Sequence, residues 1–232
     1  MTHDAHLMPL VITDQSLDQE GISALIVRNL SVTLQNCDME GVDLSRLSLS
    51  GWTFDNCRMA RAKLVGANLS ETRWTACRGA FIDFTGADLT EADIAGCDFN
   101  NGNFRGVRLT SANIKRCKLT GADFTEAQTL GCEFEEVIFV DARLPGFYFR
   151  KMHVKFLDFS NADLSCCDFR EATFEECSLR EAHLVDSRFD GADLRGAELG
   201  GVRLNNAKQF KGAIISRAQA AELLSELGLR VL

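Results

Sequence analysis

Residues 86–99 read GADLTEADIAGCDF, and this stretch decides the fold. Large apolar residues stand at every fifth place, at Leu89, Ile94 and Phe99, and the residue two places before each is alanine or cysteine. Residues two apart on an extended segment point to the same side. Each five-residue unit therefore sends one large and one small side chain inward, and its other three, mostly polar positions face water. Neither a helix period of 3.6 nor a strand period of 2 produces this pattern.

The same pattern extends in both directions along the chain. Every fifth residue from Leu34 to Leu204 is large and apolar except Gly79 and Thr129, and twelve of the 16 phenylalanines fall in this register. The residues two places earlier, from Val32 to Val202, are mostly Ala, Cys or Val. A repeat of this regularity predicts one continuous solenoid, and the short period leaves no room for separate domains inside it.

Two residue columns predict that four of these units make one coil. Six of the nine cysteines recur at every fourth unit: Cys37, Cys57, Cys77, Cys97, Cys117 and Cys177. A second series with the same spacing avoids adjacent acids, as stacking about 4.8 Å apart requires: Asp43, Lys63, Asp83, Asn103, Asp123, Arg143, Asp163, His183 and Arg203. The spacing thus predicts a four-sided tube that rises one level with every four units.

Units such as GADLTEADIAGCDF (86–99) and GADLRGAELGGVRL (191–204) resemble the pentapeptide repeat family. The resemblance covers residues 32–207 and implies an all-β fold, a right-handed quadrilateral β-helix, which we expect over residues 32–211. The predicted structural core includes these phenylalanines and cysteines: Phe54, Phe99, Phe124, Phe159, Phe169, Cys37, Cys57, Cys77, Cys97 and Cys117.

The cysteine column could also be interpreted as a metal wire or a disulfide ladder. Parallel stacked side chains hold their Cβ atoms near 4.8 Å, beyond the usual disulfide range of about 3.5–4.5 Å. The chain has no CxxC, and its four histidines do not pair with cysteines at zinc-ligand spacing. Small inward slots suit cysteine as a compact apolar residue. We therefore expect packing cysteines, and no metal, cofactor or disulfide.

Both ends of a solenoid need caps, because open strand edges invite aggregation. Residues 1–10 are expected to be mobile. Residues 11–31 are expected to form a degenerate first coil, since apolar residues still recur at every fifth position there, at Ile12, Leu17, Ile22 and Val27, although the rest of the repeat is lost. Residues 212–232 predict a short C-terminal helix and tail. Ser216 and Gln219 have the spacing of a capping box.

The apolar residues of the C-terminal segment admit two interpretations. They could cover the last coil, or they could pack against a second copy across a two-fold axis. We favour the second, a homodimer whose interface residues are Leu223, Leu224, Leu227, Leu229 and Val231.

The tail AAELLSELGLRVL (220–232) resembles the C-terminus of Qnr-type quinolone-resistance proteins and their relative MfpA. That resemblance implies a dimeric, DNA-mimicking rod that binds DNA gyrase or topoisomerase IV and protects it from poisons or inhibits it, conferring drug or toxin resistance. Here the register of five never slips, so a projecting loop could arise only at Gly79–Phe81 or Gln128–Leu130. The alternative at both places is a tolerated core defect, which we favour.

Charge limits the kind of mimicry. A dimer about 80 Å long would replace duplex carrying about 47 charges, whereas two chains of net charge −8 supply far fewer. Mimicry would need an acidic stripe, for which Glu126, Glu135, Glu136, Glu171, Glu175, Glu176, Glu181 and Asp190 are candidates; ordinary solubilising charge is the alternative. The same negative balance argues against direct nucleic-acid binding.

Residues 138–157 are the least regular stretch. Ile138, Val140, Tyr148 and Phe156 fall on outward positions, where apolar residues rimmed by charge mark a partner site or a bulge around larger inward side chains. The candidate partner surface therefore comprises Glu126, Glu135, Glu136, Ile138, Val140, Tyr148, Phe156, Glu171, Glu175 and Glu176.

No catalytic motif is present in the sequence, so we expect a protein that is not an enzyme. The N-terminus lacks the basic region and long apolar stretch of a secretory signal, and no stretch approaches the roughly 20 apolar residues of a membrane span. A cytoplasmic location without membrane contact is expected. The alternative to topoisomerase binding is a scaffold or interaction rod with an unrelated protein partner, such as an effector or immunity protein.

Overall fold

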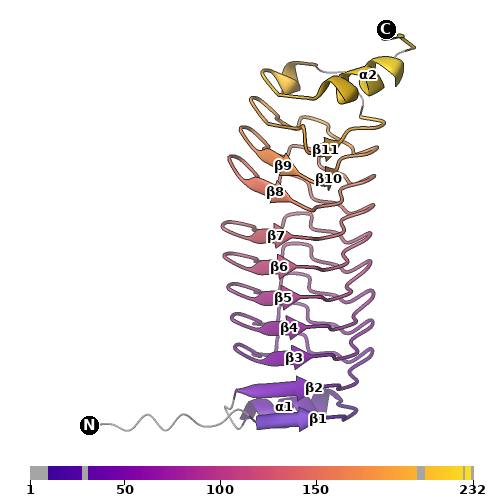
Figure 1. The fold of residues 1–232 in the computed structure, drawn as a ribbon. Coiled ribbons are helices and arrows are strands. Elements are labelled where there is room, and N and C mark those ends of the chain that lie inside the picture. The colour runs from indigo at the N-terminus through magenta and orange to yellow at the C-terminus, as the bar shows by residue number, and fades with distance from the viewer. Residues whose placement is uncertain (1–9, 28–30, 203–206, 227, 231–232) are drawn as a thin grey trace.

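The computed structural model describes residues 10–27, 31–202, 207–226 and 228–230. The chain winds into a right-handed, four-sided β-solenoid of about nine coils, confirming the predicted fold class (Figure 1). We name its faces by the large inward residue of the first regular coil: face A at Leu34, face B at Met39, face C at Leu44 and face D at Leu49. Each face recurs after four units, as the parallel pairing of Leu34 with Phe54 shows.

Face A carries a sheet of nine parallel strands in sequential order. Its strands are β1 (Leu10–Thr13), β2 (Val32–Gln35), β3 (Thr53–Asp55), β4 (Arg73–Thr75), β5 (Asp93–Ala95), β6 (Asn113–Lys115), β7 (Glu133–Glu135), β8 (His153–Lys155) and β9 (Thr173–Glu175). Face B adds the pair β10 (Cys177–Ser178) and β11 (Ala197–Glu198). Elsewhere single bridges join the coils, including the predicted charged column on face C from Asp43 to His183.

Large and small inward residues fill the tube as the repeat predicts. All ten predicted core residues are buried, with at most 1 % of their surface exposed. Aromatic rings stack directly between coils, for example Phe149 on Phe169 at 4.9 Å and Phe169 on Phe189 at 4.8 Å between ring centroids. The core therefore runs along the axis of the rod, with each coil covering the one before it.

Each corner has a left-handed residue. Every fifth residue from 36 to 191 has a φ between 49° and 75°, and most of these residues are not glycine. Left-handed backbone costs an L-residue roughly 1–2 kcal/mol, so each corner is a local cost that stacking offsets. The sequence analysis did not detect this requirement, because glycine occupies only some of the corners.

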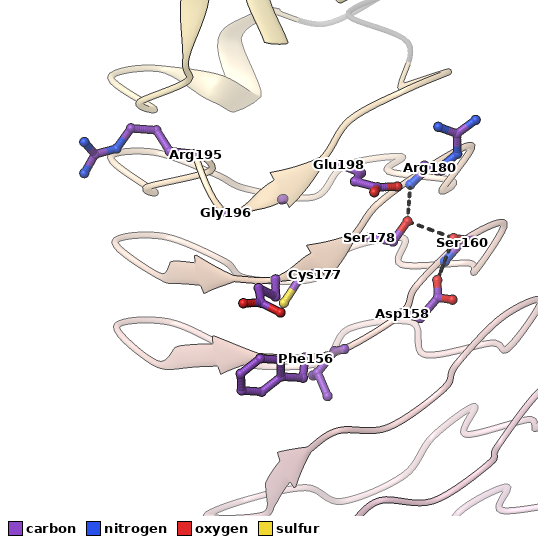
Figure 2. A pocket seen from close by; sticks show the side chains of 12 residues that line it. Phe156, Asp158, Ser160, Cys177, Ser178, Arg180, Arg195, Gly196 and Glu198 are labelled. Atoms are coloured by element: carbon purple, nitrogen blue, oxygen red, sulfur yellow. Dashed lines mark hydrogen bonds between the residues drawn. The ribbon is translucent and has the colours of Figure 1, made fainter. Parts of the chain in front are cut away.

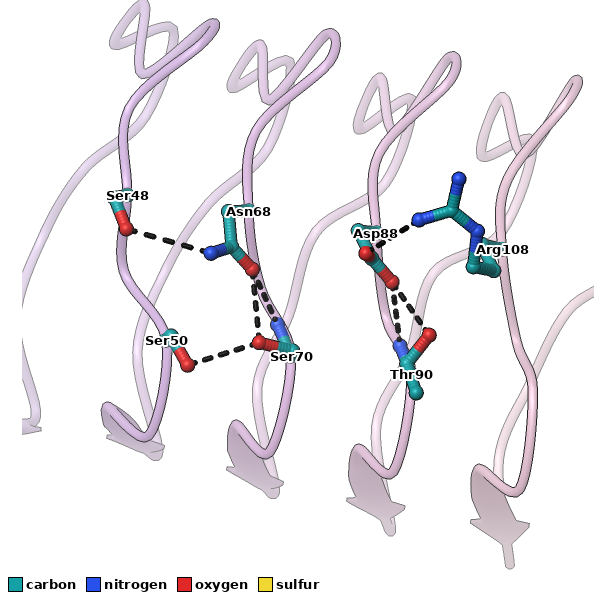
Figure 3. Close-up of polar contacts among 7 residues, drawn as sticks. All are labelled: Ser48, Ser50, Asn68, Ser70, Asp88, Thr90 and Arg108. Atoms are coloured by element: carbon teal, nitrogen blue, oxygen red, sulfur yellow. Dashed lines mark hydrogen bonds and ion pairs between the residues drawn. The ribbon is translucent and has the colours of Figure 1, made fainter.

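The polar residue before each centre stabilises the turn that follows (Figure 3). Asp88 accepts hydrogen bonds from the Thr90 backbone amide at 3.0 Å and from its hydroxyl at 2.6 Å, and Arg108 of the next coil donates to its other oxygen at 2.6 Å. Asn68 likewise accepts from the amide and hydroxyl of Ser70, and it donates through Nδ2 to Ser48 Oγ of the coil below. This explains why Asp or Asn precedes the large residue and Ser or Thr follows it.

The N-terminal end is half coil and half helix. β1 pairs with β2, and Ser16 bridges Asp38 on face B, so part of the expected first coil is present. Helix α1 (Gln19–Val27) takes the place of the rest and inserts Ile22 into the core, whereas Val27 is 85 % exposed. The predicted degenerate coil, with its five-residue spacing of apolar residues, therefore does not extend to Val27. Apart from Leu10, the residues predicted to be mobile lie outside the described residues.

At the C-terminal end the register shifts by one residue. Phe210, in the 3-10 helix η1 (Ala207–Phe210), stacks over Phe189 with centroids 5.0 Å apart, one place later along the chain than the regular spacing of four units requires. The predicted repeat to residue 211 is thus regular only as far as Val202, and Leu204 lies outside the described residues.

Helix α2 (Arg217–Glu226) closes this end, and the predicted capping box is confirmed. The Ser216 amide donates to Gln219 Oε1 at 2.6 Å, and the Gln219 amide donates to Ser216 Oγ at 3.2 Å. The Gln219 side chain is buried and donates to the carbonyls of Leu194 and Ala197 at 2.7 and 2.6 Å. One side chain therefore caps the helix and satisfies carbonyls of the last coil.

The two places where the large residue is lost differ in their consequences. Neither forms a projecting loop, because the bridges at Arg78, Asp83 and Gln128 keep the regular spacing. At Gly79 the ring of Phe99 occupies the space, only 2.9 Å from where a Cβ would lie. At Thr129 the neighbouring Leu130 is 80 % exposed, and the ladder to the next coil is interrupted.

Candidate functional site

A groove of about 730 Å³ lies on face B of the last three coils, beside the edge shared with face A (Figure 2). Phe156, Glu176 and Gly196 line it from successive corners, and Ser160 and Arg180 line it from face B. Phe156 is 37 % exposed and contributes an aromatic surface. Grooves with an aromatic surface and a few polar groups are usual binding sites.

One corner that lines the groove, Gly196, departs from the repeat. Unlike the corners below it, Gly196 has no left-handed φ, and a Cβ there would lie 2.2 Å from the carbonyl oxygen of Phe174. Among the residues that the structure describes, the Glu176 amide consequently has no hydrogen bond to Arg195 O, the partner that the regular ladder would supply. Only glycine allows this close approach, which indents the edge.

A hydrogen-bonded chain fixes the polar floor of the groove. Ser160 Oγ donates to Asp158 at 2.5 Å and lies 2.8 Å from Ser178 Oγ, which accepts from the Arg180 amide at 3.3 Å. Figure 2 shows these contacts joining two coils. The floor is therefore preorganised, and a ligand would not need to order it.

The charges at the rim are partly unpaired. Arg195 forms an ion pair with Asp193 at 2.6 Å. Within the described ranges, Glu176, Glu198 and Arg180 have no ion pair within 4.0 Å. These exposed groups can contact charged side chains of a protein partner.

The structure gathers about half of the predicted partner surface at this edge. The residues on the A–B edge, or beside it on face A or face B, are Glu135, Glu136, Ile138, Phe156, Glu175 and Glu176. Val140 is half-buried further along face B. The other predicted residues lie elsewhere: Glu126 at the C–D edge, Tyr148 on face D and Glu171 at the D–A edge.

The predicted acidic stripe is not formed. Glu126, Glu136, Glu171 and Glu181 occupy four different corners of the tube. Several of the other acids alternate with bases instead, as in the ion pairs of Lys115 with Glu135 at 3.2 Å and Lys155 with Glu175 at 3.4 Å, and Glu171 itself pairs with Arg150 at 3.2 Å. The sequence could not show that these acids are separated, because successive corner residues along the chain lie on different edges of the tube.

The residues predicted to form the dimer interface differ in their exposure. Leu223 is buried against the last coil, where it lines a small apolar pocket with Leu194 and Leu199, so it covers its own chain. Leu224 and Leu229 are 38 % and 55 % exposed. Leu227 and Val231 lie outside the described residues.

The cysteines pack as free thiols. Cys57 and Cys77 are vertical neighbours whose thiols donate to the backbone carbonyls of Leu34 and Phe54, each at 3.3 Å, and all nine cysteines are unpaired. Burial raises the pKa of Cys167 to about 12, and it also raises the pKa of Cys132. These two thiols therefore stay protonated and unreactive at neutral pH. Among the described residues, no cluster of three or more His, Cys, Asp or Glu could hold a metal.

The groove itself was missed by the sequence analysis, which placed Phe156 and Glu176 on the surface but not beside an indentation. Gly196 gave no indication of the groove in the sequence, because glycine is common at the corner positions of this repeat. In the part of the chain that the structure describes, no helix is both long and apolar enough to cross a membrane.

Comparisons with known proteins agree on the repeat. Models described as the pentapeptide repeat region and as pentapeptide repeats match residues 30–104 and residues 87–125, 155–188 and 172–208. No curated protein matches the chain.

Two solved structures show the same fold. A trypsin-treated variant of QnrB1, a plasmid-mediated fluoroquinolone resistance protein, is 21 % identical with a TM-score of 0.72, and the match covers 86 % of this chain and 100 % of that chain. HetL, from the cyanobacterium Nostoc sp. and involved in regulating heterocyst differentiation, is 18 % identical with a TM-score of 0.68, covering 85 % and 94 %.

Proposed function

The chain belongs to the pentapeptide repeat family, and from this premise we propose that it is a non-enzymatic protein that binds a bacterial type II topoisomerase and counters topoisomerase poisons. The observation that carries the proposal is the match of its rod to a trypsin-treated form of QnrB1, a fluoroquinolone resistance protein, over 86 % of this chain. The tail resemblance to Qnr-type proteins points to the same partner. A filled tube presents only its outer surface, so recognition takes place there.

The A–B edge is the surface that we assign to this partner. It combines the groove, the exposed ring of Phe156 and unpaired carboxylates at Glu176 and Glu198. Such a mixture of apolar and charged groups is usual at protein interfaces. Mimicry of DNA, in this proposal, concerns the rod and this edge and does not extend to charge over the whole surface.

Supercoiling by purified gyrase tests the proposal. The full chain is titrated into the reaction with and without a fluoroquinolone, and we expect altered supercoiling or less drug-induced cleavage. The double variant Glu136→Lys/Glu176→Lys should weaken the effect at least tenfold, because both corners lie at the A–B edge. Asp186→Lys is the matched control, since it is also an exposed left-handed corner residue but lies at the C–D edge. No effect of the wild-type chain on either readout contradicts topoisomerase binding.

A dimer formed through the C-terminal end is part of the proposal. Ile214, Ile215, Leu224 and Leu229 leave exposed apolar surface at that end of the rod. Light scattering should give about twice the chain mass of 25.6 kDa, and Leu224→Glu should halve it. Val185→Glu, at an exposed apolar position of the shaft, should not. A wild-type monomer would refute this part alone.

The match to HetL favours a second candidate, an interaction rod with an unrelated protein partner. HetL is covered to 94 % and has a regulatory role. In the gyrase experiment, this candidate predicts no change in supercoiling or cleavage at any concentration of the chain.

A further inference from the structure

The backbone ladder opens at one level of the rod. Five amides there lack the intercoil carbonyl that equivalent amides have in the adjacent coils, within the continuous range 31–202. They are Glu126, Thr129, Gly131, Tyr148 and His153, and we call this interruption the seam. It runs from the C–D edge across face D to face A, where only Glu135 and Lys155 still pair β7 with β8.

Intact hydrogen bonds surround the seam on every side. One coil below, the Leu109 and Ser111 amides donate across face D at 2.7 and 2.9 Å. One coil above, the Phe149 and Lys151 amides do so at 2.8 and 2.9 Å. On faces B and C the same two coils stay joined, as by the Phe139 amide to Asp158 O at 2.7 Å. β7 and β8 accordingly lie further apart than the strands below them in Figure 1.

Side-chain volume explains the opening. Below the seam the inward positions of face D hold only Ala127 and Thr129, where other coils have a Leu or Phe centre. Above it, Phe147 and Met152 occupy slots that hold Ala, Cys, Ser, Thr or Val in most other coils, although Leu47 and Trp52 fill the same slots near the N-terminal end. Phe134 fills the gap sideways, with its ring 6.0 Å from that of Phe147. Too little volume below and too much above hold the two coils apart on faces D and A.

We propose that the seam is a hinge at which the rod bends in one direction, opening and closing faces D and A while faces B and C act as the pivot. Local opening is easiest where backbone hydrogen bonds and packing are fewest, and both are interrupted here on the same two faces. The rod is therefore two rigid blocks, and its curvature can change without unfolding either.

Amide hydrogen exchange on the wild-type chain tests the hinge without any substitution. Thr129 and Gly131 should exchange at least tenfold faster than Leu109 and Ser111, which hold the same places one coil below. Thr129→Leu combined with Met152→Ala should slow exchange at Gly131, because it restores a large centre and a small slot. Equal protection at the two levels in the wild type would overturn the hinge.

Distances between spin labels test the direction of bending. In a Cys166→Ser background, which removes the exposed native thiol, labels at 108 and 188 span the seam along face D. Labels at 118 and 198 span the same coils along face B. Both pairs lie four coils apart, about 19 Å at 4.8 Å per coil. The face D distribution should be broader, and equal widths would contradict bending about faces B and C.

Discussion

The two blocks on either side of the seam share one backbone but differ in what fills them. The lower block, residues 31–126, has a column of five thiols on the A–B side and mostly leucine on face D. The upper block, residues 137–202, has stacked phenylalanines on face D, from Phe149 to Phe189. Intercoil backbone hydrogen bonds recur through both blocks, so the coil tolerates either set of inward side chains. Within residues 31–202, several neighbouring intercoil hydrogen bonds are missing together only between the blocks, in contrast to the single one missing at Glu176, and we attribute this opening to the mismatch in side-chain volume there.

The largest expected effect tests the aromatic filling of the upper block. Phe169→Ala removes a ring held between two others on face D and should lower the free energy of unfolding by about 3–5 kcal/mol. Leu89→Ala, at the same face in the lower block, should cost less, because a smaller side chain is lost. Urea unfolding followed by circular dichroism measures both. An equal or smaller loss for Phe169→Ala would show that ring stacking contributes nothing beyond volume.

Much of this comparison was accessible from sequence. The five-residue repeat of apolar residues located the coils, the cysteine column and the core residues, because inward positions on an extended chain have a fixed spacing. Thr129 and residues 138–157 were also recognised as irregular. What could not be predicted is that the ladder opens there, since this depends on the summed volumes of two coils and on how far Phe134 can turn into the gap.

The candidate site was less accessible than the fold. Whether acids at different corners form a stripe depends on which edge each occupies and on neighbouring bases such as Lys115 and Lys155, which pair with Glu135 and Glu175. The close approach of Gly196 to Phe174 depends on how two coils stack, and the burial of Leu223 depends on how the C-terminal helix meets the last coil. Contacts of this kind have no period for a sequence pattern to reveal.

A polar group inside the lower block gives a second, smaller test. Thr72 is fully buried, accepts a hydrogen bond from Trp74 Nε1 at 2.9 Å and donates to Leu69 O at 2.6 Å. Thr72→Val keeps the shape but leaves the indole donor unpaired, which should cost about 1–3 kcal/mol. Ser187→Ala in the upper block should cost less, because Leu164 O also accepts from the Cys167 amide. Unfolding free energies that reverse this order would contradict the assignment.

Aspartates with a lowered pKa occur in both blocks, among them Asp38, Asp88 and Asp168, and Asp168 offers a test of acid stability. The hydrogen bond from Arg170 lowers the pKa of Asp168 in the folded chain. This contribution to stability is present above the unfolded pKa near 3.9 and is lost as the pH falls through the lower folded value. Asp168→Asn should therefore destabilise the chain at neutral pH and flatten the loss of stability below about pH 4. A melting temperature that depends on pH as in the wild type would exclude this pair as a source of acid sensitivity.

The smallest expected effect concerns the corners, which both blocks share. Ala76 has a φ of 52°, a conformation that glycine adopts without steric penalty. Ala76→Gly should stabilise the chain by about 0.5 kcal/mol, the left-handed penalty removed less the added chain entropy. The reverse change, Gly96→Ala, should destabilise it by about 1 kcal/mol. Thermal melts of both variants give the sign, and a destabilised Ala76→Gly would refute the corner argument.

Direct binding to purified gyrase tests whether this rod acts through its outer surface on a type II topoisomerase. The full chain, immobilised through a terminal tag, should bind gyrase saturably. Linear duplex DNA should compete with that binding, Glu136→Lys/Glu176→Lys should weaken it, and Asp186→Lys should leave it unchanged. Absence of saturable binding by a folded wild-type chain would contradict the claim.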